Sequence, residues 1–248
     1  MRKMTPRTKA VILHHLYGLV ARDYEASVHT CRTRGIKVIE DCAQATGAEH
    51  CGTKVGALGD AAFHSTEQSK VFTTVQGGIA VTDDDTIASR IGEYHRDAPV
   101  PDMMRVERLL HTLILNYYRF THPHRWLLGD FHEVLRGKKR LLSTTAQEAR
   151  GICPADYGQK MPPSIAAIGL NQLAKIDRFN GLRQKAAQRW HAWCDAGGYA
   201  RPQVAANSVP VWLRYPVLVE AEKKKNARWA RRSLGVELGV WFTTNLHP

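Results

Sequence analysis

The 248-residue chain lacks the features that would place it in a specialised class of protein. No apolar run approaches the roughly 18–20 residues that a membrane-spanning helix needs, and the first residues lack the apolar stretch of a signal peptide. There is also no low-complexity tract that would favour disorder. These absences predict a soluble globular protein, long enough to bury a sizeable apolar core.

Cysteine is scarce, with five residues and no CxxC pair. An odd number of widely separated cysteines predicts a reducing, cytoplasmic compartment. We predict no metal site, because the histidines lack companion ligands at metal-binding spacing. His14 and His15 are adjacent in an expected strand and would point to opposite faces, so we interpret them as core or site-edge histidines.

Acidic residues are outnumbered, at 23 against 35 Lys and Arg, which gives a formal net charge of +12. A basic chain attracts nucleic acid, anionic lipid or phosphorylated small molecules. No RNP-like, zinc-finger or basic-zipper pattern is present, so we do not predict a nucleic-acid partner.

The apolar pattern predicts an α/β fold. An apolar run at Val11–Leu16, helical spacing over Tyr24–Arg34 and a second apolar run at Lys37–Cys42 form an expected βαβ unit. The pattern also predicts strands at Ala61–Ser65, Gly77–Thr82, Val209–Val219 and Gly235–Phe242, and helices at Asp83–Tyr94, Val106–Leu128, Pro163–Arg189 and Glu220–Leu234. The long helix at 163–189 is expected to bend near Asn180-Gly181. We expect residues 1–184 to form a large domain, with a helical segment at about 106–130, and residues 185–248 to form part of a smaller one.

The segment 106–128 is apolar and aromatic at near-helical spacing and carries Arg119 and Arg125. We favour a core or subunit-interface helix. The alternative is a helix that contacts a membrane surface.

Two charged residues follow apolar segments in a suggestive order. Asp41 ends an expected buried strand, where open α/β sheets present ligand groups, and Lys70 precedes Thr73-Thr74 and Gly77-Gly78. Taken alone, such an aspartate is typical of a cap and such a lysine of a solvated loop. Cys42 is more typical of a small buried residue than of a nucleophile. Hydroxyls and glycines beside a lysine nevertheless suit an anionic cofactor with a carbonyl group.

The ordered combination resembles the DegT/DnrJ/EryC1/StrS family, the sugar aminotransferases of fold type I that use pyridoxal 5'-phosphate. The stretches that carry the resemblance are His15–Gly18, Lys37–Ala48, Val55–Ala62, Ser65–Gly78 and Ile165–Leu173. The resemblance implies a mostly parallel sheet from the large domain of fold type I, plus part of a smaller α/β domain.

The resemblance also implies the roles of four residues. Lys70 would carry the cofactor as a Schiff base and act as the catalytic residue, and Asp41 would pair with the pyridine nitrogen. Gln44 would contact the 3-oxygen of the ring and Ser65 the phosphate. The implied reaction moves an amino group from an amino acid, expected to be glutamate, to a nucleotide-linked keto-sugar in a homodimer.

The chain departs from the family pattern in some places. It looks truncated at both ends relative to the family, Gln76 replaces a family glutamate, and Gly158 stands where an asparagine is usual. These departures leave an alternative open, an aminotransferase-like protein that binds cofactor or partners without turnover.

Overall fold

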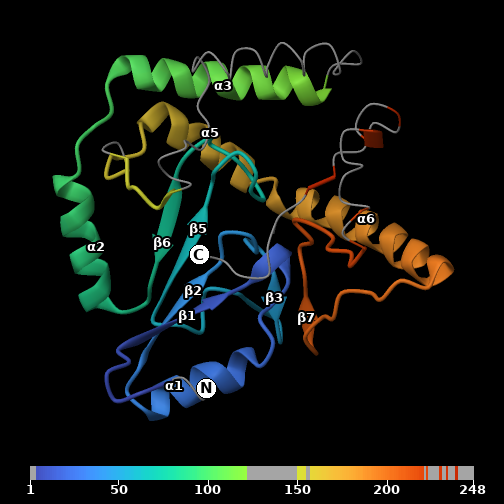
Figure 1. The fold of residues 1–248 in the computed structure, drawn as a ribbon. Coiled ribbons are helices and arrows are strands. Elements are labelled where there is room, and N and C mark those ends of the chain that lie inside the picture. Colours follow the sequence, from blue (N-terminus) through green and yellow to red (C-terminus); the bar gives the residue numbers. More distant parts are fainter. Residues whose placement is uncertain are drawn as a thin grey trace.

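A computed structural model describes residues 4–121, 150–154 and 157–220, with a few isolated positions beyond them. Its main sheet has the strand order β1-β2-β5-β6 (Figure 1). These strands are β1 (Ala10–His14), β2 (Lys37–Asp41), β5 (Ala61–Ser65) and β6 (Gly78–Val81). The first three are parallel, and β6 runs antiparallel to β5. The predicted α/β class is thus confirmed, with one antiparallel strand that the pattern did not specify.

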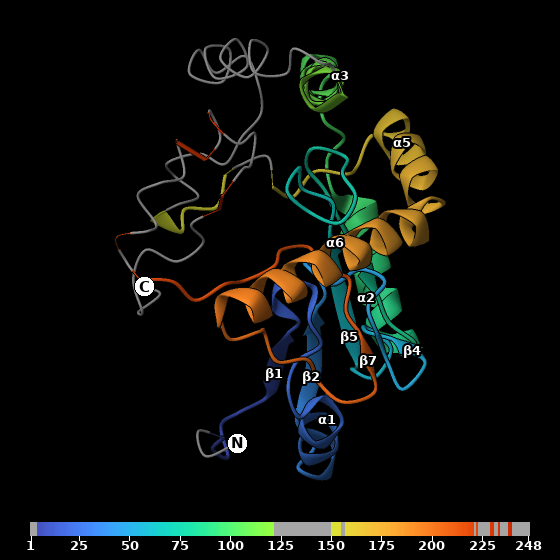
Figure 2. The ribbon, with the colours of Figure 1, turned by 90° about the vertical axis from the view of Figure 1, so that its right-hand side faces the viewer.

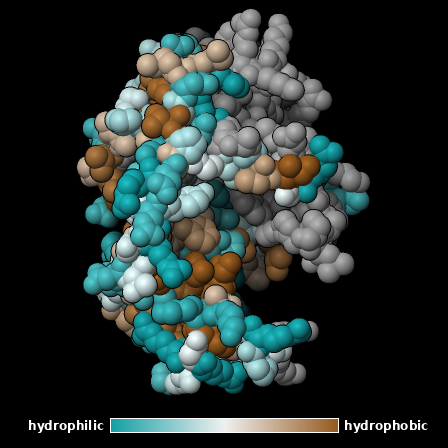
Figure 3. Space-filling view, turned by 90° about the vertical axis from the view of Figure 1, so that its left-hand side faces the viewer, coloured by the Kyte–Doolittle hydropathy of each residue, from teal (hydrophilic) through white to brown (hydrophobic). Residues whose placement is uncertain are grey.

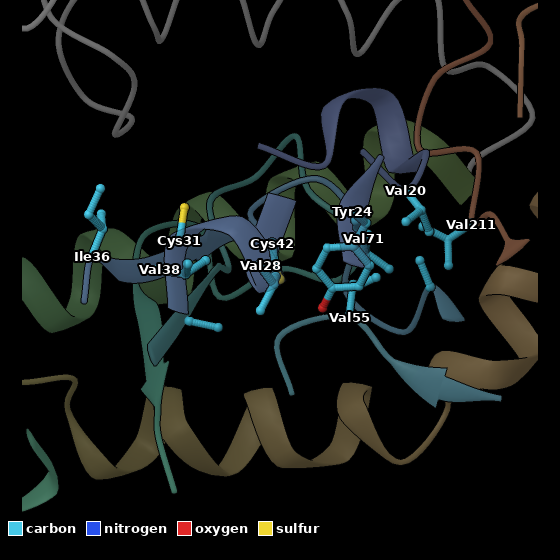
Figure 4. Close-up of a cluster of buried hydrophobic side chains, with 13 residues drawn as sticks. Val20, Tyr24, Val28, Cys31, Ile36, Val38, Cys42, Val55, Val71 and Val211 are labelled. Carbon is cyan, nitrogen blue, oxygen red and sulfur yellow. The ribbon is translucent and has the colours of Figure 1, made fainter. Parts of the chain in front are cut away.

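The expected βαβ unit forms the centre of the core. Helix α1 (Tyr24–Thr33) connects β1 to β2, and Val28 and Cys31 of α1 belong to one buried cluster with Val38 of β2 (Figure 4). Burying each side chain of this size stabilises the fold by about 1.5–3 kcal/mol, so the cluster fixes β2 and the residues at its carboxyl end.

The described part of the chain also forms four longer helices. They are α2 (Asp85–Asp97), α3 (Met103–Thr121), α5 (Pro163–Leu173) and α6 (Ile176–Gly197). The predicted bend near Asn180-Gly181 is wrong, because the chain turns between α5 and α6 at Ala174–Lys175 (Figure 2). Helix α6 continues through Gly181, and a Cβ at this position would meet no atom within 4 Å.

A small second sheet has the order β4-β3-β7. Its antiparallel strands are β3 (Glu49–His50), β4 (Thr53–Lys54) and β7 (Ser208–Val209). The predicted strand at 209–219 is wrong beyond Val209, since residues 210–220 form no ladder. Val211 is nevertheless buried, and its N–H donates to Gly18 O at 2.9 Å. The apolar residues at the start of this run are therefore explained by burial and not by strand pairing. The elements predicted within 220–242 lie mostly outside the described residues.

Helix α3 contributes to a second apolar cluster. Leu109 is buried together with Val75 and Ile165, which supports the core interpretation for this side of the helix. Its part beyond Thr121 lies outside the described residues, and the membrane-surface alternative is not tested. None of the helices in the described part of the chain is both long and apolar enough to cross a bilayer.

Apolar side chains also reach the surface near the antiparallel strand. Ile79 and Val81 of β6 are more than a third exposed, and Tyr94 of α2 is 71% exposed. Hydrophobic patches interrupt the hydrophilic surface on the face drawn in Figure 3. Within the described residues, the apolar side chains near β6 are therefore not fully covered by other parts of the chain.

Replacing Gly18 by alanine should destabilise the fold by about 2–4 kcal/mol. Gly18 has a φ of +84°, and a Cβ there would lie 2.7 Å from Leu213 N and 2.8 Å from Trp212 N, both backbone atoms. The matched control is Gly35→Ala, where φ is +65° but no atom lies within 4 Å. The control should cost only about 1 kcal/mol, the strain of the left-handed backbone. Urea unfolding of both variants checks this, and equal losses would contradict it.

Candidate functional site

The carboxyl ends of three parallel strands meet at one edge of the main sheet. In register, His14 of β1 lies beside Asp41 of β2, and Asp41 lies beside Phe63 of β5. Ser65 ends β5 and pairs with Gly78 of β6. This is the edge where open α/β sheets bind ligands, and the topology brings Asp41 and Ser65 to it.

Asp41 has few protein partners for a carboxylate. Its Oδ1 accepts a hydrogen bond from Ala43 N at 3.0 Å, and its Oδ2 lies 3.6 Å from His14 Nε2. The side chain is 20% exposed. Because a carboxylate can accept about four hydrogen bonds, Asp41 retains capacity for a cationic N–H of a ligand.

Gln44 and Ser65, two other predicted cofactor residues, are held by local backbone. Gln44 is buried, and its Oε1 accepts from Tyr17 N at 2.9 Å. This bond orients the amide, so that its Nε2 is the donor for a ligand oxygen. Ser65 Oγ accepts from Glu67 N at 3.3 Å, which leaves its hydroxyl hydrogen to donate to an anion.

Lys70 lies in a hairpin-like segment, residues 66–77, that extends from the same edge. Thr66 N donates to Gly77 O and Gln68 N donates to Val75 O, both at 3.0 Å. Lys70 is partly buried at the far end of this segment. Asp41, Gln44 and Ser65 thus lie at or just beyond the carboxyl ends of β2 and β5, and Lys70 lies on a segment that extends from the same edge. The roles of all four residues stay predictions.

Side chains from α5 and α6 anchor the Lys70 segment. Gln172 of α5 accepts from Thr73 N at 3.2 Å and donates back to Thr73 O. Arg183 of α6 donates to Val71 O at 2.6 Å. Burial lowers the pKa of the Arg183 guanidinium, so this contact occurs in a poorly solvated place where hydrogen bonds are strong.

The same helix contacts the segment that carries Gln44. Asn180 Nδ2 donates to Thr46 O at 3.2 Å, and Asn180 Oδ1 accepts from Arg183 at 3.1 Å. One Asn–Arg pair on α6 thus connects the loop after β2 with the loop after β5. The sequence pattern does not indicate this connection.

We expect Arg183→Met to loosen the Lys70 segment without unfolding the chain. The variant keeps the length of the apolar stem and removes the donor to Val71 O, so the amides of residues 71–75 should exchange about tenfold faster with deuterium. Hydrogen–deuterium exchange with peptide mass spectrometry measures this. Arg189→Met, at an exposed position of α6, is the matched control and should leave exchange unchanged. Equal effects of the two variants would argue against an anchoring role.

Glu40, which the sequence analysis also missed, is a buried ionised carboxylate next to Asp41. Both its carboxylate oxygens receive hydrogen bonds, at 2.6–3.0 Å, from His15 Nε2, Tyr24 OH and the backbone N–H groups of Gly56, Leu58 and Gly59. Burial alone would raise the pKa of Glu40, but these donors outweigh it and lower the pKa to about 2. A signal was present in the sequence. Glu40 shares a strand face with buried Val38, and a carboxylate at such a position requires donors.

Cys42 lies beside His15 and Glu40, and these three side chains form a structural cluster. The ligand atoms of His15, Glu40 and Cys42 lie within 4.8 Å of one another, but Glu40 already has five donors. Burial, followed by the charges of Glu40 and Asp41, raises the pKa of the Cys42 thiol. A thiol that stays protonated is a poor nucleophile, in agreement with the predicted buried role.

Gln76 and Gly158, the two positions that depart from the family pattern, lie next to different helices, α3 and α2. Gln76 Oε1 accepts from Arg105 at 2.8 Å, so the amide joins the Lys70 segment to α3. A Cβ at Gly158 would lie 3.4 Å from Tyr94 OH.

Comparison with known proteins gives a family match along the chain. A profile of the DegT/DnrJ/EryC1/StrS aminotransferase family matches residues 1–124 and 128–248. The L-glutamine:scyllo-inosose aminotransferase of Streptomyces griseus is 41% identical over 248 residues, covering 99% of this chain and 50% of the relative. The GDP-perosamine synthase of Caulobacter vibrioides is 42% identical over 88 residues, covering 36% of this chain and 24% of the relative. The chain spans half or less of the length of the curated relatives that it matches.

Solved structures show the same fold. The aminotransferase TlmJ from Streptoalloteichus hindustanus superposes with a TM-score of 0.65 at 22% identity, over 95% of this chain and 52% of that one. The E. coli GDP-4-keto-6-deoxy-D-mannose-3-dehydratase with bound hydrated PLP superposes with a TM-score of 0.62 at 19% identity, over 95% and 54%. The expected fold type I architecture is thereby confirmed.

Proposed function

Because the chain belongs to the DegT/DnrJ/EryC1/StrS aminotransferase family, we propose that it forms the cofactor-binding part of a pyridoxal-phosphate-dependent sugar aminotransferase. The observation that carries this proposal is the placement of Asp41, Ser65 and the Lys70 segment at one carboxyl edge of the sheet.

The side chains fit such a cofactor by the chemistry of their donors and acceptors. Asp41 has spare acceptor capacity for a protonated ring nitrogen, and Gln44 offers an amide donor to the 3-oxygen. Ser65 provides a hydroxyl for a phosphate. When bound, the cofactor would supply an electron sink for the negative charge that develops on the substrate carbon.

Lys70 would act at a single atom, Nζ. As a nucleophilic amine, Nζ would hold the cofactor at its carbonyl carbon. The same nitrogen would also be the base that moves a proton during the reaction. In the net reaction the donor amino acid becomes a 2-oxo acid, and the acceptor carbonyl becomes a carbon bearing an amino group.

For substrates, we propose an L-amino acid donor, glutamate or glutamine, and a keto-sugar or keto-cyclitol acceptor. The names of two relatives suggest the two kinds of acceptor. One is an L-glutamine:scyllo-inosose aminotransferase and the other is a GDP-perosamine synthase. The net charge of +12 suits an anionic, nucleotide-linked acceptor. Assembly as a homodimer stays a prediction.

The decisive test is chemical trapping on the purified chain. After incubation with pyridoxal 5'-phosphate and borohydride, peptide mass spectrometry should find the reduced adduct on Lys70, and the exposed Lys185 should stay unmodified. A folded chain with no adduct on Lys70 would refute the proposal. If the adduct forms but neither L-glutamate nor L-glutamine yields a 2-oxo acid, the non-catalytic alternative is favoured.

A further inference from the structure

Two adjacent His–carboxylate pairs lie on opposite faces of the sheet where β1 and β2 end. His15 and Glu40 form the buried pair, with both side chains fully inaccessible. Ala21 N donates to His15 Nδ1, so Nε2 carries the proton and donates to Glu40. His14 and Asp41 form the other pair, in which His14 is 43% exposed and Asp41 20%.

The strand register produces this arrangement. His14 and Asp41 are Cα partners in parallel strands, so their side chains emerge on the same face. Each neighbouring residue points the opposite way. The buried pair has a structural role, because the donors to Glu40 fill its acceptor capacity. The side chains of His14 and Asp41 are partly exposed, so burial in the core does not account for their contact.

His14 contacts Asp41 on one side and a surface pocket on the other. Together with Tyr17 and Arg22 it lines a surface pocket of about 510 Å³. Its Nε2 lies 3.6 Å from Asp41 Oδ2, while the other oxygen of Asp41 is held by Ala43 N. His14 is thus the side chain that limits how the outer oxygen of this carboxylate can turn.

We propose that His14 is a positioning residue for the cofactor, acting through Asp41. This inference rests on the proposed function. By lying beside Oδ2, His14 would restrict the rotation of the Asp41 carboxylate and so strengthen its contact with the ring nitrogen, but not the contacts of the phosphate or of Lys70.

The test compares two ligands that differ only at the ring nitrogen. Equilibrium dissociation constants are measured by absorbance titration for pyridoxal 5'-phosphate and for its 1-deaza analogue, which has carbon in place of that nitrogen. His14→Val should weaken the affinity for pyridoxal phosphate about tenfold, because the contact that restrains the Asp41 carboxylate is lost. It should weaken the affinity for the deaza analogue less than twofold. His14→Asn, which retains an N–H donor, should restore most of the affinity. His29→Val, at an exposed position of α1, is the control and should change neither.

Equal weakening of both ligands by His14→Val would overturn the inference, because a merely structural residue would affect them alike. Unchanged affinity for pyridoxal phosphate would overturn it too. In both cases the unmodified chain still binds the cofactor and the proposed function stands. If the folded, unmodified chain binds neither ligand, the proposed function fails and the inference fails with it.

Discussion

Replacing Glu40 by alanine should cost about 3–5 kcal/mol of folding free energy, the largest stability effect that we expect from a single substitution in this chain. The variant leaves Tyr24 OH, His15 Nε2 and three backbone N–H groups without their shared acceptor in a place that excludes water. Urea unfolding followed by circular dichroism measures the loss. Glu93→Ala, at an exposed position of α2, is the matched control and should change stability by about 0.5 kcal/mol or less.

The same carboxylate predicts a pH dependence. The pKa of Glu40 is lowered from 4.5 to about 2 in the folded chain, so its contribution is fully present above pH 4.5 and is lost as the pH falls toward 2. The stability difference between the unmodified chain and Glu40→Gln should therefore shrink by a few kcal/mol between pH 5 and pH 2. Parallel stability curves of the two proteins across this range would contradict the assignment of an ionised Glu40.

Lys70→Ala should abolish the borohydride-stabilised adduct and lower 2-oxo acid release by about a thousandfold or more. The substitution removes both the nucleophile and the group that moves the proton, and proton transfer alone contributes about 10²–10⁴-fold. Rapid-quench measurement of a single turnover with L-glutamine and L-glutamate checks this in the cofactor-loaded chain.

The control for Lys70 is Lys185→Ala, which removes an exposed lysine and should retain full activity. Partial rescue of Lys70→Ala by a small added amine would support the proton-transfer role. Comparable rates for Lys70→Ala and the unmodified chain would exclude Lys70 as the catalytic group.

Much of the fold could be predicted because local apolar patterns set it. The strands at 10–14, 37–41 and 61–65 and helix α1 fall where the periodicity indicated. The predicted strand at 209–219 failed because burial and strand pairing give the same apolar run. The bend was misplaced because an Asn-Gly pair is tolerated inside α6, where Asn180 is held by Thr46 and Gly181 faces open space.

Some residues of the candidate site could be predicted from the sequence and others could not. Asp41, Gln44, Ser65 and Lys70 were identified because they stand in an order that resembles a known family. Glu40 was missed, since its donors come from the residue after β1, from α1 and from the 56–59 loop, and only the folded chain brings these together. Arg183 was missed for the same reason, because nothing in its sequence neighbourhood indicates a contact with Val71.

The anchors from α5 and α6 also bear on the order in which the chain can fold during synthesis. The contact of Arg183 with Val71 spans 112 positions, that of Gln172 with Thr73 spans 99, and that of Asn180 with Thr46 spans 134. The β1–α1–β2 unit can form from local contacts soon after it leaves the ribosome, whereas the Lys70 segment cannot be anchored until α6 has been made. We therefore expect the Lys70 segment to be anchored only after residue 183 has left the ribosome.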